Sequence, residues 1–207
     1  INGSTAGILS AISAIASRGR SLIIARNCHK AVYHAAFLNR MKLHYVYPEE
    51  IAGYGIAGPV PAVNIAEKIE DILYAERAQG KAACELIGGV VITSPTYEGT
   101  VSEIKADIPV IIDAAHGSHF GFAEFLPSQA QGDLVIHSLH KTLPSLTQTA
   151  VIHIHNEKYA ELVKKYMDIF ESSSPSYILL ASIEKCIDFL ENSQDAFHKY
   201  EILLNGF

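Results

Sequence analysis

The sequence predicts an α/β protein with three layers, in which a mostly parallel sheet lies between two layers of helices. Segments with the apolar spacing of helices alternate with short runs of β-branched residues. These runs are almost continuously hydrophobic, as expected for strands that helices cover on both faces. Of the 207 residues, 49% are hydrophobic and 18% are charged, which is typical of a folded domain and unlike a disordered chain.

The expected helices follow from apolar residues that recur every three or four positions. In the segment 3–19, Ile8, Ile12 and Ile15 recur with small residues between them, and Gly19 is expected to close the helix. The other expected helical segments are 29–40, 62–80 and 157–207, the last with a break at SSSPSY (172–177).

The expected strands are β-branched runs that end in small or polar residues. They lie at 21–27, 42–48, 88–95, 108–117, 133–140 and 149–155. Between the third and fourth of these, only the segment 102–107 reads as helical, which is little for a parallel crossover. The sequence also does not begin with Met. We therefore expect that this sequence is a piece of a longer protein. We also expect that residues are missing within it, at short connections such as this one.

Charge and cysteine content exclude several classes of partner. The formal net charge is −6, and the sequence contains no basic stripe that would neutralise nucleic-acid phosphates. No apolar run approaches the length of a membrane span. Cys28, Cys84 and Cys186 lack CxxC spacing, which favours reduced thiols and a cytoplasmic protein. We expect neither nucleic acid nor a membrane as a partner.

Polar side chains follow the expected strands at the points where these strands end. Ligands of open α/β sheets bind outside the carboxyl ends of the strands, so we expect these residues to meet at one rim. They are Arg26, Asn27 and His29; Thr93, Ser94, Thr96 and Tyr97; Asp113; His137, Ser138, His140 and Lys141; and Ser4, Thr5 and Gly7 at the start of the first helix.

Taken singly, most of these residues also have an ordinary structural interpretation. Ser4 and Thr5 can be N-caps of a helix rather than a seat for an anion. Asp113 can cap the turn that follows its strand, and His29 can be a packed or exposed histidine without function. The sequence leaves these alternatives open.

Lys141 is the residue that a structural role explains least well. A lysine near a low-dielectric rim loses solvation, so its pKa is expected to fall and its neutral amine becomes a nucleophile toward carbonyls. Ser138 and Thr142 lie close enough in sequence to hold a phosphate. Together with Asp113, this set matches what pyridoxal phosphate requires: a Schiff-base lysine, an acid that keeps the pyridine nitrogen protonated, and a phosphate cradle.

Two other motifs are weaker indications of a site. GYGIAG (53–58) fits the GxGxxG pattern, but it runs into Pro59 and Pro61, so we interpret it as a loop and not as a dinucleotide site. HGSH (116–119) and HSLH (137–140) each place two histidines three residues apart. Neither has the additional ligands of a strong zinc signature, so we predict no metal.

The segments NGSTAG, RNCHKAVYHA, GIAGPV, TSPTYEG, DAAHGSHFGF, HSLHKTLPSLTQTA and SSSPSYILLAS resemble, in this order, motifs of the Orn/Lys/Arg decarboxylase group. These are pyridoxal-phosphate enzymes of the aspartate-aminotransferase fold, and the resemblance covers roughly residues 1–185. It implies a cofactor-binding large domain at 1–171 and a helical segment at 172–207 that leads to a C-terminal domain outside this sequence. It also implies a homodimer or a higher homo-oligomer.

The resemblance implies a role for each residue at a matching position. Lys141 would form the Schiff base and later move a proton at the substrate carbon, while Asp113 would pair with the pyridinium nitrogen. His29 would stack on one face of the ring and Ala115 would pack against the other. The remaining implied contacts to the cofactor are Ser4, Thr5, Ala6, Ser138 and His140 at the phosphate, Thr96 near the ring hydroxyl, His116, and Ser173 or Ser174 from the neighbouring subunit.

The implied reaction is decarboxylation of lysine, arginine or ornithine, which gives a diamine or agmatine and CO₂ and serves polyamine biosynthesis. Loss of CO₂ leaves a carbanion that a protonated pyridine can stabilise. Transamination or β-elimination on the same cofactor remains open, although the arginine that transamination normally needs near the C-terminus has no counterpart here. A non-catalytic relative is the other alternative, and the joint presence of Lys141, Asp113 and His29 argues against it.

Overall fold

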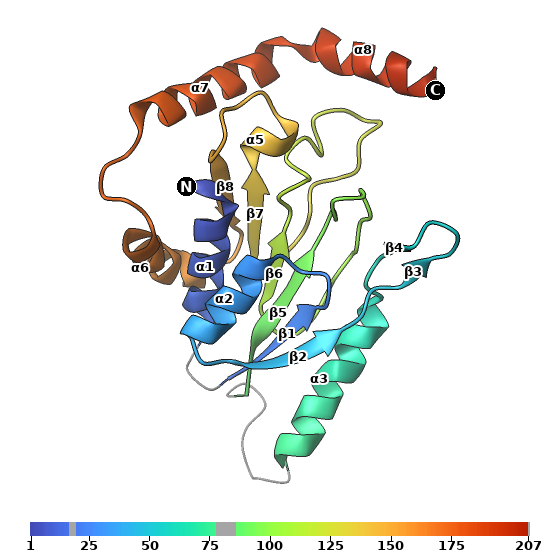
Figure 1. Cartoon of the computed structure of the whole chain (residues 1–207), viewed down its shortest axis with the longest axis vertical. Helices are drawn as coiled ribbons and strands as arrows, with labels where there is room; N and C mark the ends of the chain where they lie inside the picture. The colour runs from blue at the N-terminus through green and yellow to red at the C-terminus, as the bar shows by residue number, and fades with distance from the viewer. Residues whose placement is uncertain (17–19, 78–85, 207) are drawn as a thin grey trace.

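The computed structural model describes residues 1–16, 20–77 and 86–206, and its central sheet confirms the predicted α/β class (Figure 1). Six strands lie in the order β2-β1-β5-β6-β7-β8. Neighbouring strands are parallel except β7 and β8, which are antiparallel. The strands are β1 (Ser21–Ala25), β2 (Lys42–Val46), β5 (Ile87–Thr93), β6 (Val110–Asp113), β7 (Leu134–Ser138) and β8 (Ala150–Ile154).

Helices pack against both faces of this sheet, which gives the three predicted layers. One face is covered by α1 (Gly3–Ile15), α2 (Lys30–Leu38) and α6 (Ala160–Phe170), the last preceded by a 3₁₀ turn, η1 (Glu157–Tyr159). The other face is covered by α3 (Ala62–Arg77). Because helices cover both faces, β1, β6 and β7 are buried along their whole length.

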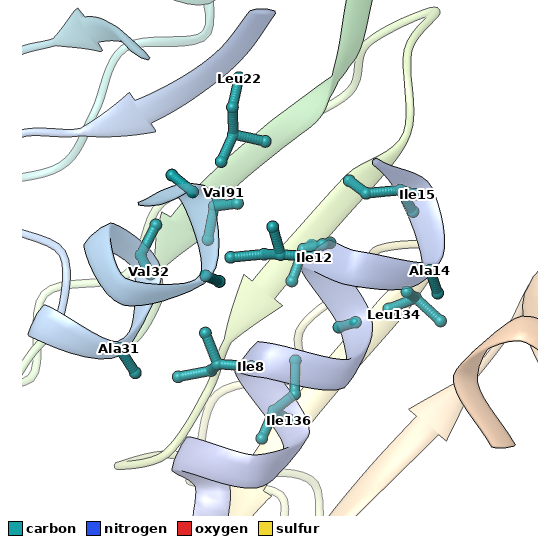
Figure 2. Packing of buried hydrophobic residues seen from close by; sticks show 14 of the residues in the cluster. Ile8, Ile12, Ala14, Ile15, Leu22, Ala31, Val32, Val91, Leu134 and Ile136 are labelled. Atoms are coloured by element: carbon teal, nitrogen blue, oxygen red, sulfur yellow. The ribbon is translucent and has the colours of Figure 1, made fainter. Parts of the chain in front are cut away.

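The predicted isoleucine stripe of α1 forms the centre of the larger core cluster (Figure 2). Ile8, Ile12 and Ile15 have only 1%, 0% and 5% of their surface exposed, and they pack among residues of α2 and the sheet that include Ile136. Gly7 allows this close approach, since a Cβ at that position would lie 3.1 Å from Ile136 Cγ2. The burial of the stripe therefore fixes α1 against β7.

Several predicted boundaries are corrected by the structure. The first helix ends at Ile15, and the expected closure at Gly19 lies outside the described residues. No helical turn forms at 102–107, because the crossover from β5 to β6 runs as irregular chain. The GYGIAG segment does not start a helix; it contributes the turn and second strand of a hairpin, formed by β3 (Glu50–Ile51) and β4 (Ile56–Ala57).

The chain beyond the predicted break at 172–177 forms two helices that lie across the carboxyl-end side of the sheet (Figure 1). These are α7 (Tyr177–Asn192) and α8 (Gln194–Asn205). Ser176 caps α7 by accepting a hydrogen bond from the Leu179 N–H. Phe197 of α8 stacks on Phe122, with ring centroids 6.0 Å apart. The predicted division of the chain between residues 171 and 172 stays a prediction.

No helix among the described residues is long and apolar enough to cross a lipid bilayer. Cys28 and Cys186 are buried, and no disulfide joins these two described cysteines. Cys84 lies outside the described residues.

We expect Ile12→Ala to lower the free energy of unfolding by about 2–5 kcal/mol, because it leaves a cavity in the core where α1 meets the sheet. The measurement is urea-induced unfolding followed by circular dichroism. Val63→Ala is the control, since Val63 on α3 is 58% exposed and its truncation is expected to change stability by about 0.5 kcal/mol or less. Equal losses in the two variants would contradict this account of the core.

Candidate active site

A cavity of about 510 Å³ lies where β5, β6 and β7 end, and its size suits a small molecule. Most of the predicted site residues line it, although they come from separate segments of the chain. These residues are Ser4, Thr5, His29, Thr96, Asp113, Ala115, His116, Ser138, His140 and Lys141. The structure thus brings together most of the residues that the sequence led us to expect at one rim, whereas Gly7, Arg26, Ser94 and His137 do not line the cavity.

Thr142, which we considered for the phosphate, does not line this cavity, and neither do three residues with a role implied by the resemblance. Ala6 is buried in the first turn of α1. Ser174 lines a neighbouring cavity of about 260 Å³, and Ser173 is exposed and lines neither of the two. The implied contacts of Ser173 or Ser174 with the cofactor of another subunit remain predictions.

The first turn of α1 forms one wall of the cavity. The N-cap of this helix is Asn2, so the interpretation of Ser4 and Thr5 as N-caps is wrong. Asn2 makes no side-chain capping bond and the first turn contains no acidic residue. The first N–H groups of a helix have no intrahelical partner and carry partial positive charge. Ser4 Oγ is hydrogen-bonded to Ser138 Oγ, so hydroxyls of two elements lie beside these N–H groups.

His29 serves as a cap and lines the cavity at the same time. It is the N-cap of α2, and its Nδ1 accepts a hydrogen bond from the Ala31 N–H at 3.2 Å. Burial lowers the pKa of His29, and the charge of Lys141 lowers it further while Asp113 opposes the shift. A neutral imidazole that accepts at Nδ1 carries its proton on Nε2. The structural and functional interpretations of this histidine are therefore compatible.

Asp113 ends β6 inside the protein, with only 3% of its surface exposed. Its Oδ1 accepts a hydrogen bond from the Ala115 N–H at 3.2 Å, so it also caps the following turn. Burial raises the pKa of this carboxyl, whereas the Ala115 N–H, Lys141 and His29 act to lower it. A cationic group placed in the cavity beside Asp113 would stabilise its ionised form.

Lys141 lies in the short helix α5 (Leu139–Thr142), directly after β7. Its side chain is exposed and is not desolvated in the way that we expected from the sequence. Lys141 Nζ lies 3.1 Å from His116 Nε2. Burial lowers the pKa of His116, and Lys141 lowers it further, while Glu98 opposes the shift. A neutral imidazole with no proton on Nε2 can accept a hydrogen bond from Lys141 Nζ.

The turn after β5 forms another part of the cavity wall. Thr96 is buried, and a pair of hydrogen bonds with Thr100 closes the turn. Tyr97 packs edge-on against His116, with ring centroids 5.5 Å apart. The next residue, Glu98, is exposed and also lines the cavity. The turn is therefore a rigid support for side chains at the mouth of the site.

Some cavity residues were not predicted as site residues. The sequence placed Asn27, Thr93 and Tyr97 at the rim without a role, and it did not point to the rest. Glu98 could have been noticed as an acid directly after the candidate Thr96. The others lie in quoted segments or in the isoleucine stripe, but we assigned them no role in a site; they are Asn2, Gly3, Ile8, Ala57, Thr147 and Gln148.

The paired histidines have separate surroundings. His116 contacts Lys141, whereas His119 packs against Phe120 with ring centroids 4.9 Å apart. His137 packs against His153 of β8 with ring centroids 5.1 Å apart, whereas His140 Nδ1 lies 2.9 Å from the Thr149 carbonyl oxygen. Within the described part of the chain, no three His, Cys, Asp or Glu residues are arranged to hold a metal ion.

The residues around the cavity fit pyridoxal phosphate. The first turn of α1 with its hydroxyls suits a phosphate, the Lys141 amine suits an aldehyde, and the Asp113 carboxyl suits a protonated ring nitrogen. Thr93 supplies an independent indication, because its Oγ1 is buried without a hydrogen-bond partner in the described structure. Thr93 lines the same cavity, so a polar atom of a ligand would satisfy this hydroxyl.

Comparison with known proteins agrees with this fit. The family model "Orn/Lys/Arg decarboxylase, major domain" matches residues 1–205. The uncharacterized protein YaaO of Bacillus subtilis (strain 168) is 33% identical over 197 residues, which is 89% of this chain and 38% of YaaO. An arginine decarboxylase of Bacillus cereus is 28% identical and is matched over 98% of this chain and 47% of the relative. This chain therefore spans less than half of the length of either relative.

Solved structures show the same similarity. The constitutive lysine decarboxylase of Escherichia coli superposes with a TM-score of 0.67 and 26% sequence identity. The match covers 91% of this chain and 28% of that enzyme. The similarity thus extends over nearly the whole of this chain but only over a part of the larger protein.

We expect acidification to destabilise the protein through His137, which is 5% exposed beside the cavity residue Ser138. Burial lowers its folded-state pKa from 6.5 to about 4. The unfolded chain therefore binds a proton between pH 6.5 and pH 4 that the folded chain does not, which lowers the free energy of unfolding by up to about 3 kcal/mol. In His137→Phe, this part of the pH dependence should vanish. Urea unfolding at pH 7, 5.5 and 4.5 measures it, and identical pH profiles would refute the assignment.

Proposed function

This chain belongs to the Orn/Lys/Arg decarboxylase family, and from this premise we propose that it is the pyridoxal-phosphate-binding part of an enzyme that decarboxylates lysine, arginine or ornithine. The products would be a diamine or agmatine and CO₂, as in polyamine biosynthesis. The observation that carries the proposal is that Lys141, Asp113, His29 and the first turn of α1 line one cavity. Membership of the family supports decarboxylation over transamination or β-elimination.

The residues of the chain would hold the cofactor through three kinds of contact. Ser4 and Ser138, with the N–H groups of the first turn of α1, would bind the phosphate. Lys141 would bind the aldehyde covalently, and Asp113 would hold a proton on the ring nitrogen. When bound, pyridoxal phosphate supplies the electron sink for the electron pair that the departing CO₂ leaves behind.

Lys141 would deliver the proton that replaces the carboxylate at the substrate carbon, and His116 would lie beside it. Lys141 Nζ and His116 Nε2 are 3.1 Å apart, within hydrogen-bonding distance. The lowered pKa of His116 keeps its imidazole neutral near pH 7, so its Nε2 can accept a hydrogen bond from Lys141 Nζ and orient the amine that would deliver the proton. His29, with its pKa also lowered, would add an uncharged surface beside the ring.

Glu98 is our candidate for recognition of the basic end of the substrate. Among the described residues that line the cavity, the carboxylates are Asp113 and Glu98. Asp113 is buried, whereas Glu98 is exposed on the closed turn after β5. An ammonium or guanidinium group needs a carboxylate partner that it can reach. Glu98 meets this requirement, which supports a basic amino acid as the substrate.

We also propose a homodimer or a higher homo-oligomer in which Ser173 or Ser174 reaches the phosphate of the neighbouring subunit. The support is the position of the exposed segment around these serines. Ser174 lines the smaller cavity together with Gln148, and Gln148 also lines the larger cavity. Groups that approach from this side would therefore arrive next to the first turn of α1.

We expect pyridoxal phosphate followed by borohydride to label Lys141 in the longest chain that the gene encodes, because reduction makes the bond between amine and aldehyde permanent. Peptide mass mapping locates the label. Lys141→Arg should abolish it, whereas the control Lys30→Arg, which alters an exposed lysine at the start of α2, should keep it. Absence of the label from wild type would refute the cofactor assignment.

CO₂ release from lysine, arginine and ornithine then tests the reaction, and a labelled protein that releases none would point to another reaction.

We expect Glu98→Gln to raise KM for the preferred basic amino acid about tenfold or more, because it removes one charge-assisted contact. For norleucine, which lacks the distal cation, KM should stay within about twofold. Glu103→Gln is a suitable control, since Glu103 lies on the same crossover but does not line the cavity. If KM rises equally for both substrates, Glu98 does not recognise the distal cation.

A further inference from the structure

Gln148 adopts a backbone conformation that its side chain disfavours. Its φ is +77°, in the left-handed region that glycine prefers. The Thr149 N–H donates to the Leu146 carbonyl at 3.2 Å, which closes a turn with Gln148 as its third residue. A positive φ at this position is the mark of a type II turn, where glycine is the usual residue. The chain nevertheless carries glutamine there.

The next residue holds the turn in place. Thr149 is 1% exposed, and its Oγ1 donates to the Leu146 carbonyl oxygen at 2.7 Å. Its own carbonyl oxygen accepts from the Leu139 N–H at 3.0 Å and lies 2.9 Å from His140 Nδ1. These bonds tie the turn to α5, which carries Lys141. The position of Gln148 is therefore set by the same short helix that positions Lys141.

Arg40 also has a positive φ, and the end of a helix explains it. Its φ is +52°, and it follows α2 directly after the cap residue Asn39. The Arg40 N–H donates to the Phe37 carbonyl and the Met41 N–H to the Ala36 carbonyl, which together end the helix in a Schellman motif. Gln148 ends no helix in this way. The type II turn accounts for the positive φ at residue 148 but favours glycine there, so a glutamine that bears this strain is a reason to look for a function.

The surroundings of Gln148 indicate what that function is. Gln148 lines the cavity with Asn2, Gly3, Ser4 and Thr5, the residues at the start of α1. A backbone bridge between Asn2 and Thr149 places this turn beside that helix start. The exposed Gln148 amide makes no hydrogen bond to any other described residue. Its NH₂ group, which has two donors, therefore stands free next to N–H groups that suit an anion.

We infer that Gln148 is a further cofactor-binding residue, whose side-chain amide donates to the phosphate of pyridoxal phosphate at the start of α1. The inference rests on the proposed function, since it names a new contact in the same site. It also gives a reason for a glutamine at a turn position that glycine prefers, because this residue lines the cavity with the residues at the start of α1.

The test compares Gln148→Gly, Gln148→Ala and the control Arg40→Gly with wild type in the longest chain that the gene encodes. Affinities for pyridoxal phosphate and for pyridoxal, which lacks the phosphate, are measured by absorbance titration, and the Tm is measured without cofactor. We expect both Gln148 variants to bind pyridoxal phosphate about tenfold more weakly and pyridoxal equally well. Glycine should keep or raise the Tm, because it relieves the positive φ. Arg40→Gly should leave both affinities unchanged.

Three outcomes would overturn the inference. The first is an unchanged affinity for pyridoxal phosphate in both Gln148 variants, and the second is an affinity for pyridoxal that falls as much as the affinity for pyridoxal phosphate. The third is a weaker affinity for pyridoxal phosphate in Gln148→Gly alone, which would show that backbone stiffness and not the amide is responsible. If wild type shows no label at Lys141, the proposed function fails separately. Binding of inorganic phosphate then tests the role of Gln148. Weaker phosphate binding by both variants than by wild type supports this role, and equal binding refutes it.

Discussion

The packing of α1 against the sheet is the constraint on which the candidate active site depends. Burial of Ile8, Ile12 and Ile15 contributes roughly 1.5–3 kcal/mol for each side chain, so the helix cannot move without a large loss of stability. Because α1 is fixed along its apolar stripe, its first turn is held beside the end of β7. Ser4 then meets Ser138, three residues before Lys141. Apolar packing thus determines how far the proposed phosphate site lies from the Lys141 amine.

Parallel strand pairing and burial set the electrostatics of the site. Thr93 and Asp113 are partners in the pairing of β5 with β6, so their side chains lie at one edge of the sheet. The same covered sheet that buries Asp113 raises the pKa of its carboxyl, and partial burial lowers the pKa of His29 and His116. The result is a cavity with neutral imidazoles, one exposed amine and a carboxyl that a cationic ring would ionise. Such a combination suits proton transfer near neutral pH.

Two turns beside the cavity carry the side chains to which we assign further ligand contacts. The turn after β5 presents Glu98, and the turn before β8 presents Gln148. Each turn is closed by backbone hydrogen bonds, at Thr96 with Thr100 and at Leu146 with Thr149. Long side chains on rigid turns reach a ligand without a large loss of backbone entropy on binding. Functional side chains of α/β proteins are often found on such loops.

The sequence by itself determined the α/β class, the helix stripe of Ile8, Ile12 and Ile15, and the set of strand-end residues around Asp113 and Lys141. These features depend on local periodicity and on the rule that parallel strands end at one edge, which a sequence displays directly. Only the tertiary structure decided that Asn2 and not Ser4 caps α1, that Lys141 is exposed beside His116, and that Gln148 lies next to the start of α1. These features depend on contacts between segments far apart in the chain, and no local pattern of residues encodes such contacts.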